Sequence, residues 1–202
     1  MKVCNKGIIE SYGEVTGNVP SGAVKYIDPE VMEKEGKSTA LYCIMAMIVP
    51  IAIFSIKYVA IKDTPMMFSI LGIVIGCMLM LPHELLHGIC FPKGSRVELY
   101  QMMKPARMFV TSDKPMGRGR FIFMNLLPGL VLGLLPLLIW LYISPYTYVA
   151  KTLFSVGFIG TVTAGRDLMN VMKTLGSVPP FHRVQMSGAK VYYIPLFRQA
   201  DK

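Results

Sequence analysis

The sequence has few charged residues for its length. Lys, Arg, Asp and Glu make up 16% of its 202 residues, and hydrophobic residues make up 53%. The mean hydropathy is +0.49. Because a water-soluble domain carries about 25% charged residues, this composition argues against such a domain and predicts a membrane protein.

Acidic residues are the scarcer of the two charge types. The chain has 12 Asp and Glu residues against 21 Lys and Arg residues, which gives a formal net charge of +9. The basic residues are spread between apolar stretches and form no single dense patch. We therefore expect basic loops at the anionic surface of a lipid bilayer and no binding of nucleic acid.

Cysteine is also scarce, and its spacing excludes two further classes. The four cysteines form no Cys-x-x-Cys pair, and two of them lie within apolar runs. This argues against a disulfide framework and against a cysteine metal site. The start of the sequence has no apolar core followed by a cleavage site, so we expect no removable secretory signal.

Long apolar segments are abundant. Each is long enough to cross a hydrocarbon core of about 30 Å at 1.5 Å per residue. The first contains Pro50, which should kink this helix without ending it. The four segments are Thr39 to Ala60, Met66 to Phe91, Phe121 to Ile143 and Tyr148 to Leu175. We expect an all-α membrane protein in which a bundle of four transmembrane helices forms a domain from 39 to 175, between an N-terminal segment (1–38) and a C-terminal tail (176–202).

Charge predicts the orientation of these segments. With four spans, 18 Lys and Arg residues fall on one side of the membrane and 3 on the other. Both termini and the loop between the second and third spans should then be cytoplasmic. That loop has strand-like composition at 96–100 and 108–111, which is typical of a small β-hairpin, and 190–194 in the tail resembles a strand.

Histidine is the rarest functional residue, and its distribution is informative. Two of the three histidines stand in His83-Glu84-Leu85-Leu86-His87. On a helix His83 and His87 lie on one face and can present two imidazole nitrogens to one ion. Glu84 lies beside them and could take a proton from a water at the metal. The alternative is a polar pair bonded to neighbouring groups, and the presence of Glu84 favours zinc.

A third metal ligand is expected at the same depth in the membrane as His83. His83 lies 17 residues past Met66, about 26 Å along its helix, and Asp167 lies 19 residues past Tyr148, about 29 Å. Small residues at intervals of three to four in both segments favour close packing. We therefore expect Asp167 near His83, where a bound cation would offset its burial. Asp167 could instead pair with a neighbouring cation, and then Glu98 or Asp113 would be the substitute ligand.

These motifs carry a family resemblance. The resemblance rests on His83 to His87, on the segment Arg-Phe-Ile-x-x-Asn-Leu-Leu-Pro from Arg120 to Pro128, and on Gly165 to Leu168. Together they resemble the putative zincin membrane peptidase family of small four-span bacterial proteins, similar in plan to the site-2 proteases. The resemblance implies Zn²⁺ held by His83, His87 and Asp167, with Glu84 as general base, in an integral protein of the bacterial cell membrane.

The function expected from the sequence is hydrolysis of a peptide or membrane-protein substrate near the cytoplasmic face. Asn125, within the third span, is a candidate for substrate binding or for an oxyanion contact, although it could simply link helices. Two other functions use the same histidines without chemistry. One is a metal carrier or sensor, and the other is a degenerate protease that acts as a binding partner.

Overall fold

The computed structural model describes residues 2–15, 17–34, 37–62, 68–103 and 106–195. The expected start of the second span at Met66 lies outside these ranges. The chain divides into two compact units. Unit 1 consists of Met1–Gly36, Glu84–Met124 and Asn170–Lys202, and unit 2 consists of Lys37–His83 and Asn125–Met169.

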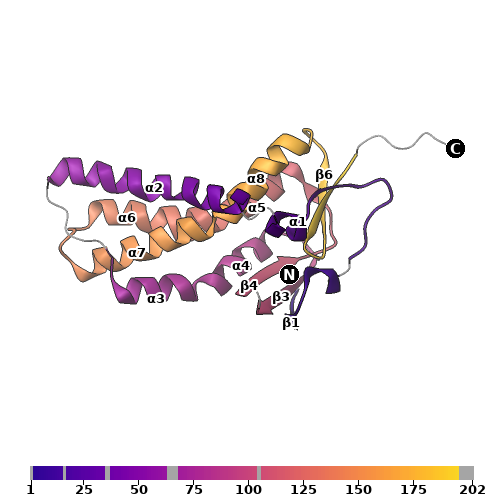
Figure 1. Ribbon diagram of the computed structural model, residues 1–202, viewed down its shortest axis with the longest axis horizontal. Coiled ribbons are helices and arrows are strands. Elements are labelled where there is room, and N and C mark those ends of the chain that lie inside the picture. Colours follow the sequence, from indigo (N-terminus) through magenta and orange to yellow (C-terminus); the bar gives the residue numbers. More distant parts are fainter. Residues whose placement is uncertain (1, 16, 35–36, 63–67, 104–105, 196–202) are drawn as a thin grey trace. The chain divides into compact units, whose positions relative to one another are not determined.

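Unit 2 is helical, as its apolar composition predicts. Figure 1 shows α2, α3, α6 and α7 running side by side, and α7 contacts the other three. Helix α2 continues through Pro50, as expected. The elements that lie in unit 2 or enter it are α2 (Lys37–Ile61), α3 (Ile70–Met78), α4 (Met80–Ile89), α5 (Arg118–Pro128), the π-helical turn η2 (Gly129–Leu134), α6 (Leu135–Tyr142), α7 (Tyr148–Thr163) and α8 (Gly165–Ser177).

The core of unit 2 centres on Trp140. This residue is fully buried, stacks on Phe54 at 6.2 Å between ring centroids and contacts Phe154 at 4.9 Å. Lys57 is also buried, and its ammonium group donates hydrogen bonds to the carbonyls of Trp140 and Ile143. The ammonium lies 4.2 Å from the centroid of the Trp140 ring. Lys57 thus adds a donor at the C-terminal end of α6, where the Trp140 carbonyl accepts the backbone N–H of Ile143 at 3.2 Å.

Glycines allow the helices of unit 2 to pack closely, as the spacing of small residues predicted. A Cβ atom at Gly72 on α3 would lie 2.7 Å from the carbonyl oxygen of Thr152 on α7. On the other side of α7, a Cβ atom at Gly160 would lie 2.2 Å from the carbonyl oxygen of Leu132 in η2. Both distances exclude a side chain without movement of the backbone. Close backbone approach of this kind is the usual basis of helix association in lipid.

Gly160→Ala is expected to lower the stability of unit 2 by about 1–3 kcal/mol, because the added methyl group overpacks the contact with η2. Thermal unfolding of the purified protein in detergent measures this loss. Gly176→Ala is the matched control, since a Cβ atom on this helical glycine meets nothing within 4 Å. Alanine there should be neutral or stabilising. Equal effects of the two substitutions would contradict the packing argument.

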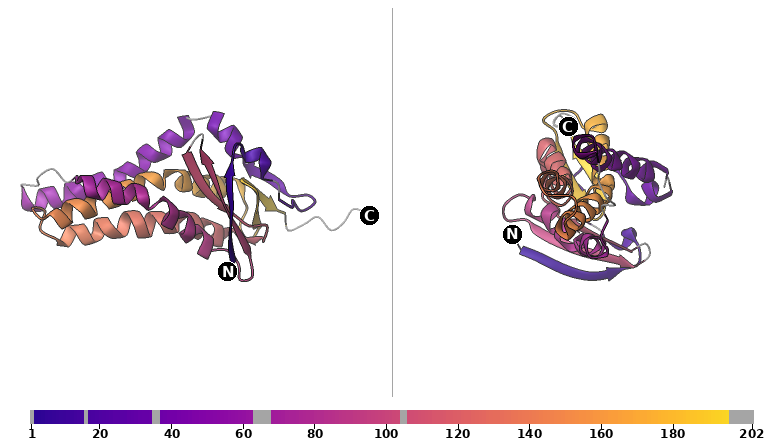
Figure 2. Two further views of the ribbon diagram at one scale, coloured as in Figure 1. Left: turned by 90° about the horizontal axis from the view of Figure 1, so that it is seen from below. Right: turned by 90° about the vertical axis from the view of Figure 1, so that its left-hand side faces the viewer.

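The first sheet of unit 1 contains the expected hairpin. Strands β3 (Arg96–Met103) and β4 (Ala106–Thr111) pair antiparallel, with Glu98 opposite Thr111. Strand β1 (Lys2–Ile9) pairs parallel to β3, so the order is β1-β3-β4 (Figure 2). Strand β1 was not predicted, because its residues do not alternate regularly between polar and apolar and its partner lies about 90 positions away.

The second sheet of unit 1 has the order β2-β7-β6-β5. Its strands are β2 (Val24–Ile27), β7 (Lys190–Ile194), β6 (Arg183–Ser187) and β5 (Met116–Gly117). The strand expected at 190–194 is therefore confirmed as β7. A two-residue turn joins β6 to β7, and Gly188 adopts a φ of +57° there, a conformation typical of tight hairpins. The short elements η1 (Tyr12–Glu14) and α1 (Pro29–Lys34) complete unit 1.

The expectation of an all-α bundle of four transmembrane helices is wrong. In the part of the chain that the structure describes, seven strands form two sheets, so the chain is a mixed α and β protein with a helical membrane part. Within the described ranges, three helices are long and apolar enough to span a membrane: Thr39–Ile61, Ile70–Ile89 and Arg118–Tyr142. The protein is therefore membrane-associated.

The expected fourth span is interrupted at Ala164. Helix α7 has 16 residues, about 24 Å, which is short of the roughly 20 residues that a span requires. The hydroxyl groups of Thr161 and Thr163 donate to carbonyls one turn earlier in α7. Such bonds compete with the backbone ladder and bend helices. The residues before the break are apolar, whereas Gly165, Arg166 and Asp167 follow it.

Candidate metal centre

The His-Glu-x-x-His motif lies on α4, in the last turns of the candidate span Ile70–Ile89. Helices α3 and α4 are separated by Leu79. Pro82 explains this interruption, because it has no N–H to donate to the carbonyl of Met78, four residues earlier. His83 stands six residues before Ile89, so it lies about 9 Å inside the end of the span.

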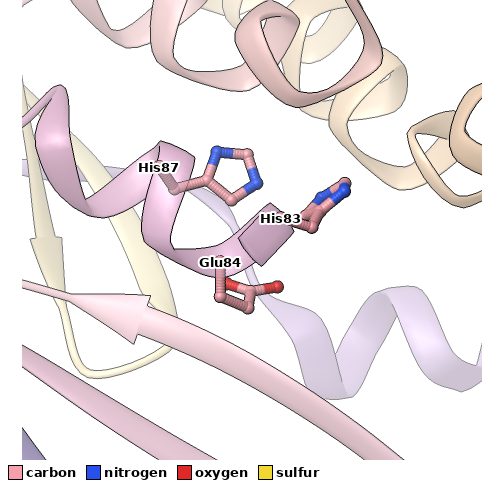
Figure 3. A group of neighbouring side chains, drawn as sticks. All are labelled: His83, Glu84 and His87. Carbon is pink, nitrogen blue, oxygen red and sulfur yellow. The ribbon is translucent and has the colours of Figure 1, made fainter. Parts of the chain in front are cut away.

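The three motif side chains form a compact donor group. One ligand atom each from His83, Glu84 and His87 can be chosen so that all three atoms lie within 4.8 Å of one another. Figure 3 shows both imidazole rings and the Glu84 carboxylate projecting from neighbouring turns of α4. His83 and His87 are buried, with exposed fractions of 9% and 7%, whereas Glu84 is half-buried. Two buried imidazoles beside a more accessible carboxylate suit two ligands and a base.

His87 is held in one tautomer. Its Nδ1 lies 2.9 Å from the carbonyl oxygen of Met124. A carbonyl oxygen only accepts hydrogen bonds, so Nδ1 carries the proton and the neutral ring has its lone pair on Nε2. Metal-binding histidines in proteins are typically oriented in this way by a bond from their second nitrogen.

The Met124 carbonyl is available because of a proline. In a regular helix this oxygen would accept the N–H of residue 128, and Pro128 has none. Helix α5 ends at Pro128 and continues as the π-helical turn η2. Met124 was not identified from the sequence. The sequence signal that could have identified it is Pro128, four residues later and inside an apolar segment.

Asp167 lies in the first turn of α8, next to His83. Its Oδ2 is 2.9 Å from Nε2 of His83, and its exposed fraction is 7%. The proximity that the depth arithmetic predicted is therefore observed within unit 2. Two ligand atoms bonded to one tetrahedral zinc at about 2.0–2.1 Å lie about 3.3 Å apart. The observed separation is close to that value, so a small movement would admit an ion.

The remaining candidates lie elsewhere. Glu98 forms an ion pair with Lys6 at 3.1 Å and accepts the Tyr100 hydroxyl at 2.9 Å. Partial burial tends to raise the pKa of Glu98, but these two partners outweigh it and the pKa lies below its ordinary value. Asp113 is exposed and lines a cavity of unit 1 beside Gly17. Neither carboxylate belongs to the donor group found in the described part of the chain.

The structure also shows the environments of Asn125 and of His182, the third histidine of the chain. Asn125 is buried and lines an apolar cavity of about 170 Å³ in unit 2, between α2, α5, η2 and the ends of α7 and α8. His182 is half-buried, and its Nδ1 lies 3.1 Å from the carbonyl oxygen of Pro180. Its ring packs against Tyr193, which indicates a structural role.

The side chains of His83, His87 and Asp167 offer donor atoms of the kinds that zinc binds. Two imidazole nitrogens with one carboxylate oxygen are a common ligand set for catalytic zinc, which keeps a fourth position for water. A family model described as "Putative zincin peptidase" matches residues 76–181.

The chain belongs to this family. The segment that matches the family model covers more than half of the sequence of this member of the zincin peptidase family. It runs from α3 to the turn after α8. It includes the motif, Met124 and Asp167. Zincins bind zinc through a His-Glu-x-x-His sequence, so membership indicates a metallopeptidase. Searches of curated proteins and of solved structures find no match.

Proposed function

We propose that this protein is a membrane-embedded zinc metallopeptidase that hydrolyses peptide bonds near the cytoplasmic face of the membrane. His83, His87 and Asp167 would hold the zinc, and Glu84 would be the general base. The observation that carries this proposal is the 2.9 Å separation of His83 Nε2 and Asp167 Oδ2, on the helix where Nδ1 of His87 is bonded to the Met124 carbonyl. The family membership supports it.

The burial and position of each residue at the site determine its proposed role. His83, His87 and Asp167 would hold a zinc ion, which would supply a coordinated water with a pKa near 7 and would polarise the scissile carbonyl. Half-buried Glu84 accepts the proton of the attacking water and later gives it to the leaving amine. Asp167 contributes a negative charge where the two imidazoles contribute none. The Met124 carbonyl holds the ring of His87 in its ligating tautomer.

The proposed cytoplasmic orientation draws on the composition of unit 1. This unit contains both termini and the loop between α4 and α5, which are the segments that charge assigned to the cytoplasm. It holds 16 of the 21 Lys and Arg residues. The site would then open about 9 Å inside the cytoplasmic end of α4, within reach of water.

Metal removal tests the function. Purified protein in nanodiscs is treated with 1,10-phenanthroline, and zinc content and cleavage of a fluorogenic peptide library are measured before treatment, after it and after addition of zinc. We expect about one zinc per chain before treatment, loss of cleavage with loss of zinc, and recovery of both. Full occupancy by zinc without cleavage of any peptide or co-reconstituted membrane protein would instead show a non-catalytic metal-binding protein.

Pro128→Ala is expected to weaken zinc binding about 10–100-fold, as is typical when the group that orients a metal-bound histidine is lost. Alanine restores an N–H that competes with His87 for the Met124 carbonyl. Competition with a fluorescent chelator measures the affinity. Pro136→Ala is the control, because this proline of α6 has no part in that contact. Unchanged affinity in Pro128→Ala would show that the proline does not matter for the site.

A further inference from the structure

Phe181 has an unusual conformation and exposure. It occupies the third position of the turn Pro179–His182, which is closed by a hydrogen bond from His182 N to Pro179 O of 3.4 Å. Its φ is +65°, a value that this turn position normally reserves for Gly or Asn. Its side chain is 90% exposed. A large apolar residue is thus held in a costly conformation, although the fold does not bury it.

The turn lies where two candidate spans end. Arg118 is the first residue of the span Arg118–Tyr142. Its backbone N–H donates to the carbonyl of His182 at 3.2 Å, and its guanidinium donates to the carbonyl of Leu175 at 3.1 Å. Two residues later, Arg120 donates to the carbonyl of Cys90 at 2.6 Å, just past the end of the candidate span Ile70–Ile89. All these contacts are within unit 1, and they bond the turn to the first residue of one candidate span and that span to the residue that follows another.

The end of α8 and the turn that holds Phe181 combine apolar and basic residues. Met172 and Leu175, on the last turns of α8, are 46% and 49% exposed. Lys173 is half-buried between them, and Arg183, two residues after Phe181, is exposed. No acidic residue occurs between Asp167 and the end of β7. Exposed apolar side chains on a segment whose own charged residues are all basic complement an anionic lipid surface.

We propose that Phe181, with Met172 and Leu175, inserts into the headgroup region of the bilayer and anchors the connection between α8 and β6 to the membrane surface. The bilayer is favoured over a protein partner because the turn is bonded directly to the first residue of a span. This surface is separate from the metal centre, so the proposal does not depend on the peptidase activity.

Tryptophan fluorescence tests this contact. Phe181→Trp is reconstituted into vesicles of phosphatidylcholine and phosphatidylglycerol, with and without acyl chains brominated near the headgroup. The emission of the wild type, which has Trp140 alone, is subtracted. Met103→Trp is the control, since Met103 is 67% exposed at the far end of β3, about 23 Å from Arg96.

We expect brominated lipid to remove most of the added emission in Phe181→Trp and little of it in Met103→Trp. Quenching of Phe181→Trp by aqueous acrylamide and not by brominated lipid would place the side chain in water and overturn the proposal. Quenching by neither reagent would show that protein covers the residue, which overturns it as well. Phe181→Gly relieves the strained φ, so its thermal stability in detergent should equal or exceed that of the wild type.

Discussion

Glu84→Gln is expected to reduce peptide hydrolysis by about 10²–10⁴-fold, because a general base contributes that much to the rate. Glutamine keeps the size of the side chain and removes its ability to accept a proton. His83, His87 and Asp167 are unchanged, so bound zinc should remain close to one ion per chain. Zinc analysis and peptide cleavage are measured on the same purified preparation.

Glu98→Gln is the matched control for this experiment. Glu98 is also a partly buried carboxylate of unit 1, but its partners are Lys6 and Tyr100. Its substitution should leave both zinc and cleavage near wild-type levels. Loss of zinc in Glu84→Gln would contradict the assigned role, because it would make Glu84 a ligand within the group formed with His83 and His87. Retained cleavage would exclude Glu84 as the base.

Asp167→Asn is expected to weaken zinc binding by more than the roughly 100-fold typical of substitutions around the ligands, since it removes a ligand itself. The substitution replaces an anionic oxygen, 2.9 Å from His83 Nε2, by a neutral amide. The site then offers no negative charge from this position to offset the charge of the ion. Zinc affinity is measured by chelator competition, and peptide cleavage should fall in parallel at limiting zinc.

Asp113→Asn is the control for Asp167→Asn, and it also tests the alternative third ligand. Asp113 is exposed in unit 1, and its substitution should not change zinc affinity. If Asp113→Asn lost zinc and Asp167→Asn kept it, the ligand assignment from depth would be wrong. Normal affinity in both variants would require a third ligand other than these two carboxylates.

The sequence by itself was enough to identify the His-Glu-x-x-His motif and to predict that Asp167 lies near His83. Both inferences use the regular geometry of a helix, where residues four apart share a face and each residue advances 1.5 Å. The β3–β4 hairpin and strand β7 were also predicted, because their signals are local alternation and β-branched or aromatic composition. The three described helices that are long and apolar enough to span a membrane follow from apolar length, which is likewise a local property.

Only the tertiary structure decided the sheets, the break at Ala164 and the support of His87. Strand β1 pairs with β3 across about 90 residues, and no local pattern marks such a partner. The division of α7 from α8 depends on threonine hydroxyls that bond to the backbone, which hydropathy does not record. The Met124 carbonyl meets His87 because Pro128 withholds a hydrogen bond and α5 packs beside α4. A sequence identifies the donor groups, but the fold determines which acceptors they meet.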